Sequence, residues 1–285
     1  PEDSSSTRFM REARITAGLI HPGIVPVYDL GTTVEGHQFF IMQVIEGVTL
    51  RELLDRTAES PADRIAYISH FLGTLCRVCQ TVGYAHHRNV LHLDLKPSNI
   101  MEGSFGEVIV LDWGVARTVG EIKEGISEED EEEFTVAGTP GYMSPEQYLG
   151  VVSDLTFQSD VYALGVILYE VLTTGSPHEG DAFSDLRDAV LGGRIRPLQE
   201  CARRNGQRRI PKPLVAICNK ALARDSAERY KDALELGEDL QAYIENRSVS
   251  AFREDPVHRV RRYVARYRAA SIAALFIVFL GAVSL

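Results

Sequence analysis

The spacing of hydrophobic and polar residues along the chain predicts a small β part followed by a long helical part. Apolar and polar residues alternate over residues 24–44, around Gly36, which predicts two strands joined by a turn. Stretches with helical spacing predict helices over residues 5–19, 61–87, 157–174, 213–223 and 230–246. Residues 175–206 contain Gly, Pro and scattered charges, and we expect one helix with loops there.

The character of the chain changes after Asn246. Residues 247–268 contain seven Arg against two acids, and residues 269–285 carry no charge. At about 1.5 Å per residue, this last stretch makes a helix of about 25 Å, against a hydrocarbon core of about 30 Å. We expect a basic juxtamembrane linker followed by a transmembrane helix that continues past the last residue, with the preceding residues in the cytoplasm. A C-terminal helix packed on the domain is the alternative, and it leaves the missing polar face unexplained.

Composition adds that the chain can bury a substantial core, since 45% of its 285 residues are hydrophobic and 25% are charged. Four cysteines are too few for a disulfide scaffold. Cys76 and Cys79 form a C-x-x-C sequence inside a long apolar stretch, and no second C-x-x-C completes a zinc site. We therefore expect both thiols to be reduced core residues of a buried helix.

A polar motif follows an apolar run between Val90 and Asn99, where the chain reads V-L-H-L-D-L-K-P-S-N. A second motif, V-I-V-L-D-W-G, places Asp112 eighteen residues beyond Asp94. Together they resemble the catalytic half of a protein kinase. In that chemistry Asp94 accepts the proton of a substrate hydroxyl, and Lys96 neutralises charge on the phosphoryl group. Asn99 and Asp112 offer hard oxygen ligands to Mg²⁺. The alternative is an ordinary polar loop after a buried strand.

Three further motifs resemble the same family and occur in its order. They read T-V-A-G-T-P-G-Y-M-S-P-E-Q from Thr135 to Gln147, S-D-V-Y-A-L-G from Ser159 to Gly165, and A-R-D-S-A-E-R-Y around Arg229. Over about Arg8 to Tyr243 the chain is similar to the eukaryotic-like bacterial Ser/Thr protein kinases. The resemblance implies an α+β, protein-kinase-like bilobal fold with a complete helical large lobe.

The resemblance also implies structural roles for residues around the catalytic loop. Glu146 is expected to form a buried ion pair with Arg229. Asp160 is expected to accept backbone N–H groups of the catalytic loop, in which His92 has a structural role. Thr139 is expected to hydrogen-bond the catalytic aspartate and lysine and to shape the acceptor pocket.

The nucleotide contacts implied by the resemblance lie nearer the N-terminus. The sequence R-F-M-R-E-A-R-I places Glu12 where the family has the glutamate that clamps a phosphate-binding lysine. The backbone of Gln43 and Ile45 is expected to meet the adenine edge, with Met101 as the floor beneath it. Trp113 replaces the Phe of the usual Asp-Phe-Gly, which exchanges one flat apolar ring for another.

The expected activation segment carries an acidic run. Glu121 to Glu133 contains eight acids and one Lys, which predicts a solvated loop. A sharper hypothesis is that the run repels acidic substrates, or that the loop becomes ordered when Thr135 is phosphorylated. Leu93 argues against this ordering, because the family often has there an Arg that binds an activation-loop phosphate.

Two elements of the family pattern do not occur in the sequence. No G-x-G-x-x-G stands ahead of Glu12, and the strand with the phosphate-binding lysine is missing. We therefore expect a piece cut inside the small lobe, which should bind ATP weakly and transfer phosphate slowly or not at all. Its expected parts are a partial small lobe (1–48), a large lobe (49–246), the linker (247–268) and the transmembrane helix (269–285).

Two classes of function remain open. The first is a membrane-anchored Ser/Thr protein kinase that uses ATP and Mg²⁺, acts on protein substrates and has no nucleic-acid partner; a homodimer for autophosphorylation is a candidate assembly. The second is a pseudokinase that signals by contact alone. The intact Asp94, Lys96, Asn99 and Asp112 favour the enzyme, since a scaffold has no physical need of a base and two metal ligands. A small-molecule phosphotransferase of similar fold is a weaker third interpretation.

Overall fold

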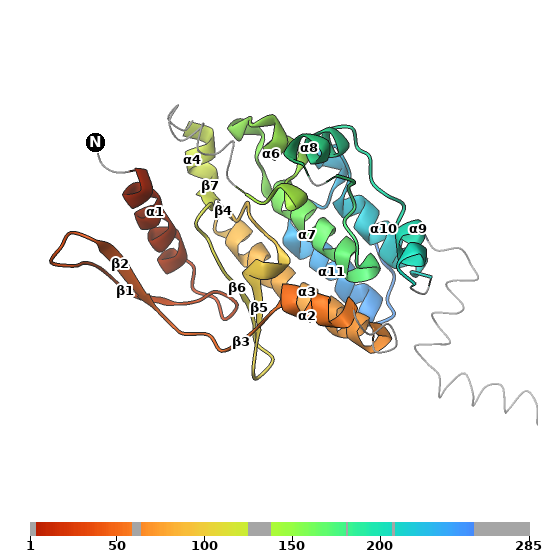
Figure 1. Cartoon of the computed structure of the whole chain (residues 1–285), viewed down its shortest axis with the longest axis horizontal. Helices are drawn as coiled ribbons and strands as arrows, with labels where there is room; N and C mark the ends of the chain where they lie inside the picture. Colours follow the sequence, from red (N-terminus) through yellow and green to blue (C-terminus); the bar gives the residue numbers. More distant parts are fainter. Residues whose placement is uncertain (1–3, 59–63, 125–137, 181, 207–208, 254–285) are drawn as a thin grey trace, which may run out of the picture.

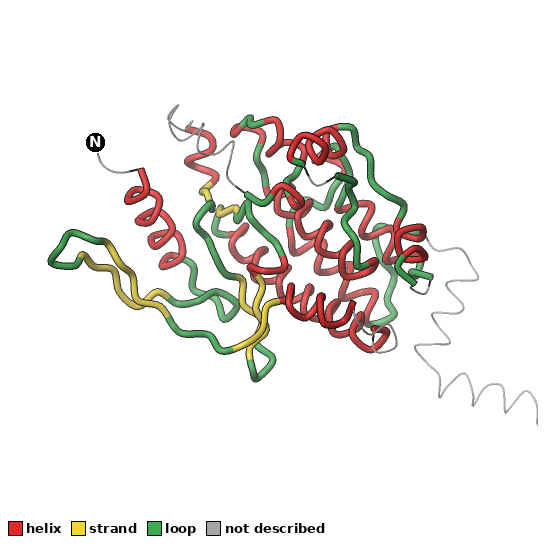
Figure 2. The backbone as a smooth tube through the Cα atoms, viewed as in Figure 1, coloured by secondary structure: helices red, strands yellow, loops and turns green. Residues whose placement is uncertain are grey.

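The structure is a computed structural model that describes residues 4–58, 64–124, 138–180, 182–206 and 209–253. Its helices are α1 (Ser4–Gly18), α2 (Leu50–Ala58), α3 (Arg64–His87), α4 (Val119–Glu124), α6 (Pro145–Leu149), α7 (Phe157–Thr173), α8 (Phe183–Leu191), α9 (Leu198–Arg204), α10 (Lys212–Ala221) and α11 (Ala233–Ile244). Its strands are β1 (Val27–Thr32), β2 (Gln38–Met42), β3 (Gly47–Thr49), β4 (Val90–Leu91), β5 (Ile100–Gly103), β6 (Val108–Val110) and β7 (Arg117–Thr118). Helices fill most of the molecule, and the longest strands lie to one side (Figure 2).

The N-terminal part consists of α1 and the antiparallel hairpin of β1 and β2, which lie at the left in Figure 1. Leu30 pairs with Phe40, and the connecting turn contains Gly36 at a φ of +90°, where a side chain would strain the backbone. α1 packs on the hairpin, with the rings of Phe9 and Phe40 4.9 Å apart between centroids. The helix and the two strands expected from the N-terminal pattern are thus confirmed.

Short strands connect this part to the helices. β3, β5 and β6 form a three-stranded antiparallel sheet in that order. Ile24 forms a parallel bridge to Val110 of β6, which ties the N-terminal part to the sheet. β4 pairs with β7, with Val90 opposite Thr118, so the chain before the catalytic loop lies beside the start of the activation segment.

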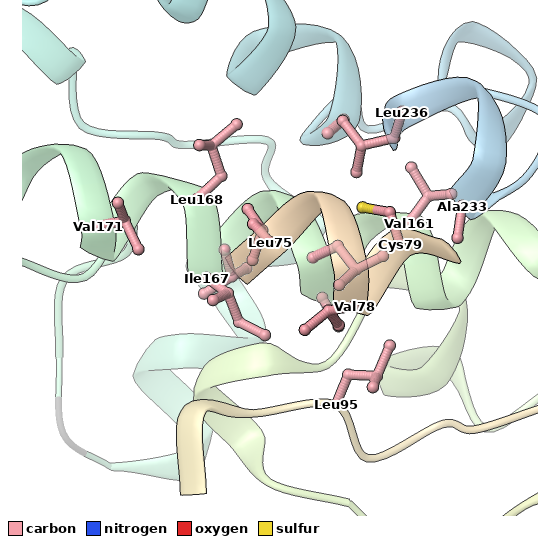
Figure 3. Packing of buried hydrophobic residues seen from close by; sticks show 14 of the residues in the cluster. Leu75, Val78, Cys79, Leu95, Val161, Ile167, Leu168, Val171, Ala233 and Leu236 are labelled. Atoms are coloured by element: carbon pink, nitrogen blue, oxygen red, sulfur yellow. The ribbon is translucent and has the colours of Figure 1, made fainter. Parts of the chain in front are cut away.

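The core of the helical part is built by α3, α7 and α11. α3 packs most extensively against α11, and α7 lies against both. Figure 3 shows side chains from these helices meeting, namely Leu75, Val78, Cys79, Val161, Ile167, Leu168, Ala233 and Leu236. Each fully buried aliphatic side chain of this kind contributes about 1.5–3 kcal/mol. Cys76 and Cys79 are free thiols that are at most 4% exposed, which confirms that they are core residues.

The predicted helices occur within three residues of their expected ends, with one instructive shift at α11. This helix begins at Ala233 because the side chain of Asp232 accepts the N–H of Glu235 at 2.9 Å and caps it. The single helix expected over residues 175–206 is wrong. The region forms two helices, α8 and α9, which Gly193 (φ +63°) and the residues after it separate.

The last described residues, 247–253, lie against α11. Asp239 of α11 is 5% exposed and accepts the backbone N–H groups of Ser250 at 2.6 Å and Ala251 at 3.0 Å. The hydroxyl of Tyr230 donates to the same carboxylate at 2.8 Å. The chain therefore leaves α11 along a path fixed by a buried acid.

The basic stretch expected to be a linker, residues 247–268, thus begins with residues that pack on the domain. Within the described ranges, no helix combines the length and hydrophobicity needed to cross a membrane. The expected transmembrane helix over residues 269–285 lies outside the described residues.

Candidate active site

The loop after β4 is anchored on the first turn of α7. Asp160 is 1% exposed, and its two carboxylate oxygens accept the backbone N–H groups of His92 at 2.9 Å and Leu93 at 2.8 Å. α7 begins here because Thr156 and Ser159 form a capping box. These are the loop contacts that the family resemblance implies for Asp160. The position of the loop is therefore set by the core helix rather than by solvent-exposed contacts.

His86 supplies a buried partner for the Asp160 carboxylate. Its Nε2 atom lies 2.9 Å from Oδ2 of Asp160, and both side chains are at most 2% exposed. Burial alone would raise the pKa of Asp160, but the hydrogen bond and charge of His86, together with His92, outweigh it and lower that pKa. The carboxylate consequently stays ionised and holds both loop N–H groups.

His92 is a buried structural residue under the loop. The centroids of the His92 and Trp113 rings are 4.6 Å apart. The indole N–H of Trp113 donates to the carbonyl of Val110 at 3.3 Å. Nδ1 accepts the N–H of Asp94 at 3.3 Å, so Nε2 carries the proton and donates to the carbonyl of Leu111 at 3.1 Å. Burial lowers the pKa of His92, which keeps the ring neutral and this pattern intact near pH 7.

Asp94, Lys96 and Thr139 form a closed hydrogen-bonded triangle. Nζ of Lys96 donates to Oδ2 of Asp94 at 2.6 Å and to Oγ1 of Thr139 at 2.8 Å. Oγ1 of Thr139 donates to Oδ1 of Asp94 at 2.9 Å, although the two residues are 45 positions apart. Asp94 is 7% exposed. The triangle thus presents a nearly buried carboxylate with an ammonium group beside it, as a proton acceptor in phosphoryl transfer requires.

Asn99 and Asp112 are the candidate Mg²⁺ ligands. The amide nitrogen of Asn99 donates to the carbonyl of Asp94 at 2.9 Å, which leaves its amide oxygen without a hydrogen bond from any described residue. Asp112 is exposed, and its Oδ1 accepts the N–H of Gly114 at 3.3 Å. Two hard oxygen ligands fit Mg²⁺, because this ion takes its other ligands from phosphates and water. No cluster of three or more His, Cys, Asp or Glu side chains in the described ranges could hold a metal instead.

Glu12 of α1 faces the turn that carries Asp112. A β-carbon placed on Gly114 would lie 3.1 Å from Oδ1 of Asp112 and 3.2 Å from Oε2 of Glu12. α1 also approaches the start of the activation segment, where Nε of Arg11 lies 3.8 Å from Oε1 of Glu121. The carboxylates of Glu12 and Asp112 thus approach the same point beside Gly114.

The residues expected at the adenine lie on the connection between β2 and β3 and on β5. The backbone N–H of Gln43 donates to the carbonyl of Pro26 at a long 3.4 Å. The backbone groups of Ile45 make no hydrogen bond to any part of the chain that the structure describes. Met101 is half-buried on the central strand of its sheet. The open backbone groups of Ile45 can hydrogen-bond a ligand, and Met101 is an apolar side chain of the kind that packs against a flat ring.

The end of the activation segment is held by a buried ion pair between Glu146 and Arg229. The guanidinium donates to both carboxylate oxygens at 2.7 and 2.9 Å, and Ser159 adds a hydrogen bond at 2.7 Å. Burial alone would raise the pKa of Glu146, but the hydrogen bonds and charge of Arg229 outweigh it and lower that pKa. The segment is thereby fixed to a residue 83 positions away. Thr135, the expected phosphorylation site, lies outside the described residues.

A second ionic cluster holds the same segment from the other side. Nη2 of Arg51 lies 2.7 Å from Oε2 of Glu170 and donates to the hydroxyl of Tyr142 at 2.8 Å. Tyr142 in turn donates to Glu170 at 3.0 Å. None of these residues stands out in the sequence, because they lie on α2, the activation segment and α7 and meet only in the folded chain.

Gln147 is another residue that the sequence motifs do not single out for function. Its amide nitrogen donates to the carbonyl of Leu93 at 2.8 Å, across 54 residues. A local signal exists, since Ser144 and Gln147 have the spacing of a helix capping box, and the structure contains that box. The spacing gives no hint of the contact with the catalytic loop.

Comparison with known sequences assigns the chain to a family. The family described as protein kinase domain matches residues 1–237 of the chain. The chain belongs to the protein kinase domain family. The expected resemblance to eukaryotic-like bacterial Ser/Thr kinases is thus confirmed, and the fold is that of a kinase domain with mixed helix and strand content.

This kinase domain is similar to named bacterial proteins. Serine/threonine-protein kinase PknD of Chlamydia pneumoniae is 38% identical over 252 residues, which cover 83% of this chain and 26% of that protein. The proteins of the same name from Protochlamydia amoebophila and Chlamydia muridarum are 34% and 36% identical over 85% of this chain. The kinase domain described here spans about a quarter of the length of these relatives, 26 to 27%.

Proposed function

We propose that this kinase domain transfers the γ-phosphoryl group of ATP to Ser or Thr hydroxyls of proteins. The observation that carries the proposal is the triangle of Asp94, Lys96 and Thr139, with contacts of 2.6, 2.8 and 2.9 Å at the buried loop. This arrangement supports the proposal, because a proton acceptor and a cation lie side by side. The names of the relatives, which are Ser/Thr kinases, support the choice of acceptor.

In this proposal each member of the triangle has a role. Asp94 accepts the proton of the substrate hydroxyl, while the oxygen of that hydroxyl forms a bond to the γ-phosphorus and the bond from this phosphorus to the ADP oxygen breaks. Lys96 neutralises charge on the transferred group, and Thr139 orients the carboxylate by its hydrogen bond. Mg²⁺, when held by Asn99 and Asp112, would neutralise phosphate charge.

The nucleotide contacts form the second part of the proposal. Gln43 and Ile45 would offer backbone groups to the adenine, Met101 would lie beneath it, and Glu12 would act as the glutamate that clamps a phosphate-binding lysine in the family. Residues 1–285 contain no Gly-x-Gly-x-x-Gly sequence ahead of Glu12, so this stretch expressed by itself should bind ATP weakly.

We further propose that the protein is anchored in the cell membrane, with the kinase domain on the cytoplasmic side. The uncharged residues 269–285 and the seven Arg of residues 247–268 support this proposal. Partition of residues 247–285 into bilayers is its test, and a product that stays in the aqueous phase would count against it.

The activity is tested with protein expressed from the complete coding sequence, Mg²⁺·ATP and a Ser/Thr protein substrate. Asp94→Asn should lower transfer by at least about 10²-fold, since a positioned general base contributes about 10²–10⁴-fold. Asp188→Asn, an exposed acid on α8, serves as the matched control and should transfer at the wild-type rate. Absence of transfer by the wild type, with ATP binding intact, would instead identify a pseudokinase.

A further inference from the structure

The side chain of Gln147 joins the end of the activation segment to the catalytic loop. Gln147 is 6% exposed. Its Oε1 accepts the N–H of Ser144 at 3.0 Å and the Ser144 hydroxyl at 3.1 Å, while its Nε2 donates to the carbonyl of Leu93 at 2.8 Å. Because a backbone N–H can only donate, the amide oxygen must face Ser144 and the nitrogen must face Leu93.

The carbonyl that Gln147 binds belongs to a strained residue. Leu93 has a φ of +66°, a conformation that a branched side chain adopts only when its surroundings enforce it. Its N–H is held by Asp160 at 2.8 Å, and its C=O is held by Gln147. Both peptide groups around Leu93 are therefore fixed, and the second of them is the peptide that leads directly to Asp94.

The side chain of Leu93 completes this arrangement. It is 5% exposed and belongs to a small apolar cluster, separate from the main core, with Leu91, Ile122, Val152 and Leu155. Ile122 lies on α4, at the start of the activation segment. Leu93 thus contacts the start of the segment by packing and the end of the segment through Gln147.

We propose that Gln147 is a positioning residue for Asp94. By holding the strained Leu93 peptide, it keeps the carboxylate aimed at Lys96 and Thr139, so that Asp94 is correctly placed only while the end of the activation segment is docked. This inference rests on the proposed phosphoryl transfer, in which Asp94 is the proton acceptor.

Two substitutions test the contact, and the chain provides a matched control. Gln147→Leu keeps the approximate volume and removes both polar partners, whereas Gln147→Glu can still accept from Ser144 but sets a carboxylate against the Leu93 carbonyl. Gln199 is the control, because it bridges a backbone N–H and C=O in the same way, both of Ile210, at 3.2 and 2.6 Å. Gln199→Leu removes an equivalent pair of hydrogen bonds outside the active site.

The first measurement is steady-state transfer by protein from the complete coding sequence. Both Gln147 variants should lower kcat at least tenfold and leave the KM for ATP within twofold of wild type, and Gln199→Leu should retain the wild-type kcat. Equal kcat values for wild type and both Gln147 variants would overturn the inference while the proposed function stands. A rise in the KM for ATP that matches the fall in kcat would also overturn it, because that pattern indicates general loss of structure.

The second measurement is amide hydrogen exchange at Leu93 and Asp94, which does not depend on activity. Gln147→Leu should speed exchange at these two amides at least tenfold relative to Gln199→Leu. Unchanged exchange would overturn the inference even if kcat fell. Faster exchange in a protein whose wild type transfers no phosphate would leave the positioning role in place and reject the proposed function.

Discussion

The acceptor side and the nucleotide side of the active site are built in opposite ways. On the acceptor side, Asp94 is 7% exposed, and its carboxylate is hydrogen-bonded to Lys96 and Thr139. On the nucleotide side, the backbone of Ile45 has no hydrogen bond from any described residue, and the nearby strand β2 is largely exposed.

The difference follows from the cost of burying polar groups. A buried charge must be paired and hydrogen-bonded, so the acceptor side has to be complete within the chain itself. Backbone groups that water can reach carry no such penalty in the absence of a ligand, since water hydrogen-bonds to them. We therefore expect the buried side to set the geometry of the chemical step and the exposed side to bind the nucleotide.

The largest effect on stability is expected at the buried ion pair that holds the end of the activation segment on the acceptor side. Arg229→Ala should lower the free energy of unfolding by about 3–5 kcal/mol, because it leaves the buried carboxylate of Glu146 without its partner. The control is Arg204→Ala, whose partner Glu200 lies at 2.6 Å with side chains 63% and 41% exposed, and it should cost at most about 1 kcal/mol. Urea denaturation of both variants measures the two values. Equal losses would show that the acceptor side is not locked by burial.

A second substitution separates the two sides by kinetics. Thr139→Val removes the hydrogen bonds to Asp94 and Lys96, and it should lower kcat about 10²-fold without changing the KM for ATP. Thr139→Ser should restore most of the rate, because it retains the hydroxyl. Glu12→Gln, on the nucleotide side, should act mainly on the KM for ATP. If the two variants changed the same kinetic constant, the proposed division of the site would fail.

The dependence of stability on pH gives a smaller effect with a definite sign. The pKa values of Glu146 and Asp160 are lowered in the folded state, so their contribution is present above the ordinary carboxylate range and is lost as the pH falls below about 4. The lowered pKa of His92 adds an earlier loss as the pH falls from about 6.5. Urea denaturation between pH 7 and 3 should show both losses in the free energy of unfolding. Glu146→Gln should reduce the loss that occurs below about pH 4. A rise in stability on acidification would contradict this account.

The smallest effect is expected from a charge at residue 135. Leu93 packs in an apolar cluster and offers no positive charge to an activation-loop phosphate. Thr135→Glu should therefore change transfer by less than tenfold in protein from the complete coding sequence. A tenfold or larger increase would show that a charged contact orders the segment.

Much of the architecture could be predicted because its signals are local. The hydrophobic spacing of α3, α7 and α10 lies within each helix, and the Gly36 turn depends only on its own backbone. The two helices over residues 183–204 were predicted as one, since Gly and Pro interrupt the pattern without showing whether a new helix follows. The start of α11 was also shifted, because the cap at Asp232 sets where this helix begins and the hydrophobic spacing does not.

The sequence by itself determined the family, the main helices and the proximity of Asp94 and Lys96, because these depend on short motifs, on hydrophobic spacing and on residues two positions apart. The contacts of Thr139 with Asp94 and Lys96 were expected from the family resemblance, and the structure contains them. Only the tertiary structure decided that Gln147 holds the Leu93 carbonyl. This contact joins residues 54 positions apart and has no local signal. Such a contact forms because a buried polar group is out of reach of water. Its hydrogen-bond partner must therefore be a group that the packing of the helices brings next to it.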